Sequence, residues 1–88
     1  MTDDPIEIPI EDWIDLHSFL PAEVAAVVEE YLTQARQKGF RQVRIIHGRG
    51  IGVQREMVRA ILSRHPEVIA FTDALDRGAT VVQLKYSP

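Results

Sequence analysis

The chain has 88 residues, of which 45% are hydrophobic and 26% are charged, and its formal net charge is -3. This length leaves room for one hydrophobic core and excludes a second domain, while the composition is that of a folded domain rather than a disordered one. The chain has no cysteine, which excludes disulfides, thiolate metal sites and a cysteine nucleophile. No stretch resembles a signal peptide or a membrane span, so we expect a cytoplasmic protein.

The charge is segregated along the sequence. Residues 1–30 hold nine acidic residues and no Lys or Arg, whereas residues 31–64 hold eight basic residues against Glu56 alone. Local Lys and Arg supply most of the binding energy toward a phosphate backbone, whatever the global charge. The excess of basic residues over 31–64 favours a nucleic-acid-binding surface. The alternative is a solvated basic helix face.

The first part of the chain predicts an arm and a strand. Residues 1–12 are acidic and contain two prolines, so we expect an extended arm, with a single domain over residues 13–88. The first strand is predicted from Trp13 to His17. Its alternation would place two residues on one face, Ile14 and Leu16, and three on the other, Trp13, Asp15 and His17.

Two helices and three further strands follow. Apolar residues at helical spacing predict a helix from Pro21 to Lys38, closed by Gly39. The remaining elements are a strand over 42–47, a helix over about 52–64 and strands over 68–72 and 79–86. The order β-α-β-α-β-β predicts an α/β fold. Crossover connections favour the first three strands as parallel neighbours, but the last two strands can also form a hairpin or lie at separate edges, so the third strand is either parallel or antiparallel to its neighbour.

A glycine-rich turn joins the second strand to the second helix. Gly48, Gly50 and Gly52 bring backbone N–H groups close to a ligand, and the start of the helix adds unpaired donors. Arg49, Arg55 and Arg59 add charge that suits phosphate oxygens. Because the turn lacks the Gly-Lys-Ser/Thr ending of a P-loop, nucleotide hydrolysis by that route is not expected. The alternative is a turn that needs glycine for steric reasons alone.

Asp15, His17 and His47 are the candidate catalytic residues. Residues two apart on a strand face the same side, and carboxyl ends of adjacent parallel strands form the binding crevices of α/β sheets. Two imidazoles and a carboxylate would then converge beside the glycine-rich turn. Alternatively, Asp15 caps a turn and His17 is a hydrogen-bonded loop residue. His65 is expected to interact with the carbonyls at a helix end.

Two motifs resemble a known family. Ile14-Asp15-Leu16-His17 resembles the Leu-Asp-Leu-His motif that opens the small MutS-related (Smr) domain, and His47-Gly48-Arg49-Gly50 resembles its His-Gly-x-Gly signature. The similarity extends from Trp13 to Val82. One departure is Ser18, which stands where the family often has glycine.

The resemblance implies a two-layer α/β sandwich in which two main helices pack on a mixed four-stranded sheet. It also implies binding to DNA or RNA, with nicking endonuclease activity in some members. By position, Asp15 and His17 match the motif linked to cleavage, Gly48, Arg49 and Gly50 match the nucleic-acid-contacting loop, and Arg55 matches a basic position after it.

Three functions remain open. In the first, His17, oriented by Asp15, activates a water, while Arg49, loop N–H groups and His47 offset charge on the scissile phosphate; in a variant, Asp15 holds a divalent metal ion. The second is a non-catalytic module that binds DNA or RNA or delivers a partner protein in repair or translation. The third, a small phosphorylated metabolite as ligand, is distinguished by a shallower salt dependence.

Overall fold

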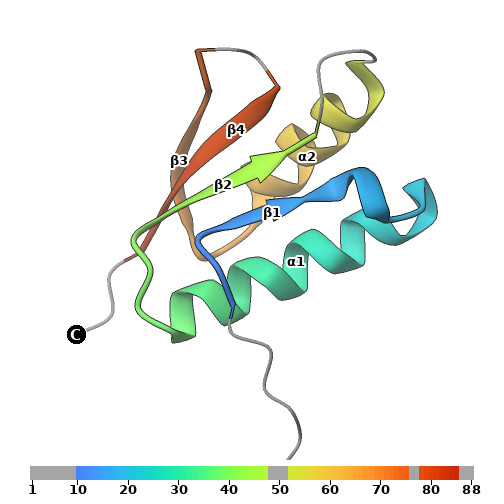
Figure 1. The fold of residues 1–88 in the computed structure, drawn as a ribbon. Coiled ribbons are helices and arrows are strands. Elements are labelled where there is room, and N and C mark those ends of the chain that lie inside the picture. The colour runs from blue at the N-terminus through green and yellow to red at the C-terminus, as the bar shows by residue number, and fades with distance from the viewer. Residues whose placement is uncertain (1–9, 48–51, 76–77, 86–88) are drawn as a thin grey trace, which may run out of the picture.

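The computed structural model describes residues 10–47, 52–75 and 78–85. Within these ranges the chain forms four strands, two α-helices and one 3-10 turn (Figure 1). In chain order they are β1 (Trp13–Asp15), η1 (Leu16–Ser18), α1 (Pro21–Gln37), β2 (Gln42–Ile46), α2 (Gly52–Arg64), β3 (Val68–Asp73) and β4 (Ala79–Leu84). The predicted order β-α-β-α-β-β is confirmed.

The four strands form one mixed sheet in the order β1-β2-β4-β3. β1 pairs with β2 in parallel, and β4 is antiparallel to both β2 and β3. β3 therefore runs in the same direction as β2 but is separated from it by β4. β1 and β2 are parallel neighbours as expected, and of the alternatives left open for the last two strands the antiparallel pair is the one found. An antiparallel partner is reached through a short turn, whereas a parallel partner needs a long crossover.

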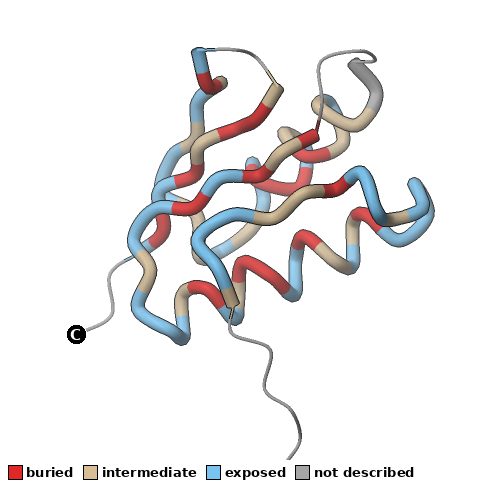
Figure 2. Tube along the Cα trace, viewed as in Figure 1, coloured by how far each residue is buried: buried red, intermediate tan, exposed pale blue. Residues whose placement is uncertain are grey.

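Both helices cover the same face of the sheet and contact each other, which makes the domain a two-layer sandwich (Figure 1). Exposed and buried residues alternate along β2, so one face of the sheet packs on the helices and the other is open (Figure 2). The core between the layers is built from these residues: Leu16, Val24, Val28, Tyr31, Leu32, Ala35, Val43, Ile45, Val58, Ile61, Leu62, Val82 and Leu84.

Helix α1 is fixed by local interactions at both ends. At its start, the backbone N–H of Leu20 donates to Oε1 of Glu23 at 2.9 Å, which satisfies one of the donors that a helix end leaves free. After its end, Gly39 has a φ of 91°, a left-handed conformation that glycine adopts at little cost. The predicted helix end, Lys38, is the C-cap residue. Neither α1 nor α2 is long and apolar enough to cross a membrane.

Candidate nucleic-acid interface

Three strand ends meet at one rim of the sheet. β1, β2 and β3 run in the same direction, so their carboxyl ends, at Asp15, Ile46 and Asp73, share an edge. Asp15 is the register partner of Ile46, and His47 follows directly. The structure thus brings Asp15 of the first motif close to His47, the described residue of the second motif. We call this edge the rim.

Asp15 ends strand β1 earlier than predicted. Its Oδ1 accepts the backbone N–H of His17 at 2.9 Å, which turns the chain into the 3-10 turn η1. The predicted strand over 13–17 is therefore wrong beyond Asp15: Leu16 enters the core, while His17 lies on an exposed turn. Asp15 does cap a turn, as the alternative interpretation had it, and it also contacts the His17 ring.

Asp15 and His17 form an exposed carboxylate–imidazole pair. Oδ1 of Asp15 lies 2.6 Å from Nδ1 of His17, and the two side chains are 43% and 62% exposed. The hydrogen bond from the His17 backbone N–H lowers the pKa of Asp15, and the side-chain contact with His17 adds to this. An ionised carboxylate only accepts, so Nδ1 carries the proton and Nε2 is the acceptor nitrogen of the neutral ring. No described residue bonds to that Nε2.

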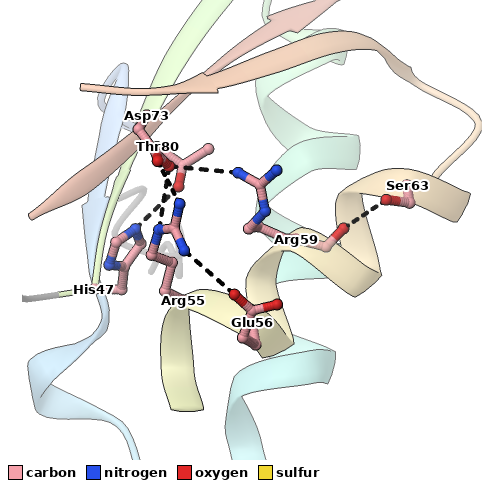
Figure 3. A network of polar contacts seen from close by, with 7 residues as sticks. All are labelled: His47, Arg55, Glu56, Arg59, Ser63, Asp73 and Thr80. Carbon is pink, nitrogen blue, oxygen red and sulfur yellow. Dashed lines mark hydrogen bonds and ion pairs between the residues drawn. The ribbon is translucent and has the colours of Figure 1, made fainter. Parts of the chain in front are cut away.

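His47 differs from His17 in burial. It is 4% exposed, its backbone N–H donates to the carbonyl of Gly78 at 3.0 Å, and its Nε2 lies 2.9 Å from Oγ1 of the fully buried Thr80 (Figure 3). The ring thereby connects the end of β2 to β4. This geometry suits a residue that fixes the end of β2 against β4.

Arg55 and Arg59 both point to Asp73, at the end of β3 (Figure 3). Arg55 donates to both carboxylate oxygens, from Nε at 3.3 Å and from Nη2, and Nη1 of Arg59 lies 3.4 Å from Oδ1. Arg59 also lies over the ring of Phe71, 5.2 Å from its centroid. The hydrogen bond from Arg55 lowers the pKa of Asp73, and the positive charges nearby act in the same direction. Arg55 and Arg59, which the sequence predicts to bind phosphate, therefore form ion pairs with the same carboxylate.

Asp73 is the site residue that the sequence analysis missed. The strand was predicted to end at Thr72, which left Asp73 in a loop; in the structure it is the last residue of β3, in register with Thr80. The available signal was an acidic residue directly after an apolar strand.

Other predicted residues are placed as follows. Gly48, Arg49 and Gly50 lie outside the described residues, and Gly52 is the first residue of α2. His65 contacts a carbonyl at the end of α2 through its backbone N–H, which donates to Leu62 at 3.4 Å, while its ring Nδ1 accepts the backbone N–H of Glu67 at 3.1 Å. Among residues 10–47, 52–75 and 78–85, no three His, Asp or Glu side chains come together in a way that could hold a metal ion. Asp15 and His17 together offer two ligands.

The fold and the rim define a class of protein: a small two-layer α/β domain with an exposed carboxylate–imidazole pair beside the carboxyl end of β2. The chain belongs to the Smr domain family, whose model matches residues 14–85.

Curated relatives and solved structures agree with this assignment. The chain is 41% identical over 76 residues to Endonuclease MutS2 of Caldicellulosiruptor bescii, covering 82% of this chain and 10% of that protein. It therefore spans about a tenth of the length of such relatives. The crystal structure of the Smr domain of Thermus thermophilus MutS2 superposes with a TM-score of 0.78 at 35% identity, covering 83% of this chain and 96% of that one.

A stand-alone relative has the same fold. YdaL, a small MutS-related protein from Escherichia coli, matches with a TM-score of 0.72 at 29% identity, covering 88% of this chain and 66% of that one. The predicted two-layer α/β sandwich with a mixed four-stranded sheet is thus confirmed.

Proposed function

We propose that this chain binds DNA or RNA at the rim and hydrolyses a phosphodiester bond there, with His17 as general base. The observation that carries the proposal is the 2.6 Å contact between Oδ1 of Asp15 and Nδ1 of His17. It fixes the tautomer in which Nε2, on an exposed ring, accepts a proton. The MutS2 relatives, which are named endonucleases, support the same reading.

Each rim residue has one role in this proposal. Nε2 of His17 takes a proton from a water as its oxygen attacks phosphorus, while the bond from phosphorus to the leaving sugar oxygen breaks and solvent water protonates that oxygen. Asp15 orients the ring and stabilises the imidazolium, which then returns its proton to solvent. The segment from Gly48 to Gly52, with Arg49, is the proposed phosphate cradle, because backbone N–H groups at the start of a helix favour anions. His47 positions this segment from its buried contact with Thr80; we assign it no direct contact with the phosphate.

Arg55 and Arg59 contribute positive charge close to the cradle. Together with Asp73 and with Glu56, whose Oε2 lies 3.2 Å from Nη1 of Arg55, they carry a net charge of about zero, so their pull on a phosphate is weaker than that of two unpaired arginines. In the proposal they attract the nucleic acid to the rim, and direct contact is left to Arg49.

The experiment compares nicking with binding. Purified protein is incubated with supercoiled plasmid and with structured RNA, with and without a chelator. Asp15→Asn keeps a side chain that caps turns well, and His17→Gln removes the base. We expect both variants to bind normally and to nick at least about 100-fold more slowly. Glu30→Gln, which changes an exposed carboxylate on α1, is the control and should nick normally.

Two outcomes contradict the proposal in different ways. Binding of nucleic acid without nicking by the unaltered protein would reject catalysis and support the non-catalytic binding or adaptor module. Binding of small phosphates with a shallow salt dependence, and no binding of nucleic acid, would reject both in favour of a metabolite ligand.

A further inference from the structure

A shallow groove lies on the open face of the sheet, where no helix packs. Its volume is about 420 Å³, and its lining includes Trp13 of β1, Arg44 and Ile46 of β2 and Val81 of β4. Asp12, which precedes β1, closes the end away from the rim. We call this feature the Trp13–Arg44 groove.

Trp13 and Arg44 are direct neighbours across the sheet. They are register partners in the parallel pairing of β1 with β2, which places their backbones about 5 Å apart. Trp13, the only tryptophan of the chain, is 47% exposed instead of packing in the core. Arg44 is exposed and takes part in no ion pair with another described residue. A half-exposed indole and a cationic side chain thus lie on neighbouring strands.

The groove is continuous with the rim. Ile46 lines it, and the register partner of Ile46 is Asp15. Trp13 and Asp15 are two residues apart on β1, so they face the same side at a separation of about 7 Å. A ligand lying along β1 would therefore reach from the indole to the His17 pair.

We propose that the Trp13–Arg44 groove binds an unpaired nucleotide next to the scissile phosphate, so that the substrate is single-stranded or locally unpaired nucleic acid. An exposed aromatic ring stacks on the face of any unstacked base, and a neighbouring guanidinium binds the adjoining phosphate. Bases in an intact duplex are stacked on each other and do not offer that face. Ile46 and Val81 form an apolar floor beneath the base. This inference rests on the proposed function and names its substrate class.

The single tryptophan provides a direct test. Its emission is followed while the protein is titrated with a short single-stranded oligonucleotide, a blunt duplex of the same sequence and an abasic oligonucleotide with the same phosphates. We expect the single strand to quench Trp13 strongly and the abasic strand to have little effect, because stacking needs a base. Quenching by the abasic strand to the same extent would overturn the proposal.

Variants test affinity by fluorescence anisotropy of a labelled oligonucleotide. Trp13→Ala should weaken single-strand binding about tenfold, and Trp13→Phe should retain most of it. Arg44→Gln should lower the slope of log affinity against log salt by about one. Leu20→Ala, which truncates an apolar residue of similar exposure at 65%, is the matched control and should bind normally. Circular dichroism checks that every variant is folded.

The outcomes separate this inference from the proposed function. If the unaltered protein binds and nicks but Trp13→Ala binds single strands with unchanged affinity, the groove is not a nucleotide site and the function stands. If Trp13 is quenched by base stacking while His17→Gln still nicks normally, the groove stands and the catalytic assignment fails. If no nucleic acid binds at all, both are rejected.

Discussion

Arg55 holds both carboxylate oxygens of Asp73, from Nε at 3.3 Å and from Nη2. A guanidinium binds a carboxylate with the same two-pronged geometry that it uses for a phosphate. Asp73 therefore binds the same edge of the Arg55 guanidinium that a phosphate would bind, and the sequence predicts that Arg55 binds phosphate. A nucleic acid that approached Arg55 would compete with this carboxylate.

The first prediction concerns affinity. Asp73→Asn removes the negative charge and leaves Arg55 and Arg59 without their common partner. We expect tighter binding of nucleic acid and a salt slope that is steeper by about one, measured by anisotropy titration between 50 and 200 mM salt (roughly the range over which counterion release is resolved). Weaker or unchanged binding would show that the arginines do not face the ligand.

The second prediction concerns stability against pH. The pKa of Asp73 is lowered in the folded protein, mainly by the hydrogen bond from Arg55. The stability that ionised Asp73 contributes is therefore complete above the ordinary carboxyl pKa of 3.8 and is lost as the pH falls through the lower pKa of the folded protein. In urea unfolding, the stability difference between the unaltered protein and Asp73→Asn should be largest near neutral pH and shrink below about pH 4. A constant difference would contradict the ion pair.

The third prediction concerns the buried contact between His47 and Thr80. Thr80 is fully buried and His47 is 4% exposed, so loss of the hydroxyl removes a partner that water does not readily replace. Thr80→Val should lower the free energy of unfolding by about 1–3 kcal/mol and slow nicking, because the turn after His47 loses its support. Thr80→Ser keeps the hydroxyl and should retain nicking. Equal nicking rates in Val and Ser variants would reject the positioning role.

The fourth prediction concerns the end of α1. Gly39 has a φ of 91°, and an added Cβ would meet no atom within 4 Å. The cost of Gly39→Ala is therefore purely conformational, about 1–2 kcal/mol in thermal or urea unfolding. Gly39→Asn should cost less, since asparagine tolerates the left-handed region. Equal stability of the alanine variant would mean that the helix end relaxes.

The sequence alone predicted the elements and their caps. The apolar spacing of α1, the start of α2 at Gly52 and the helix-closing Gly39 were all predicted and lie in the structure as expected. These features depend on interactions within a few residues, which local patterns record. The two motifs and their place at the ends of adjacent parallel strands followed from the same patterns together with the α/β connection rule.

Only the tertiary structure decided which side chains meet. It placed β4 between β2 and β3, brought Asp73 onto Arg55, and set Trp13 beside Arg44 on the open face. The end of β1 at Asp15 is the exception, because it depends on a local hydrogen bond from the backbone N–H of His17 to Oδ1 of Asp15. Strand order and register depend on which arrangement buries the apolar surface of the whole core, and that burial depends on contacts between residues far apart in the chain. Local sequence patterns do not record these long-range contacts.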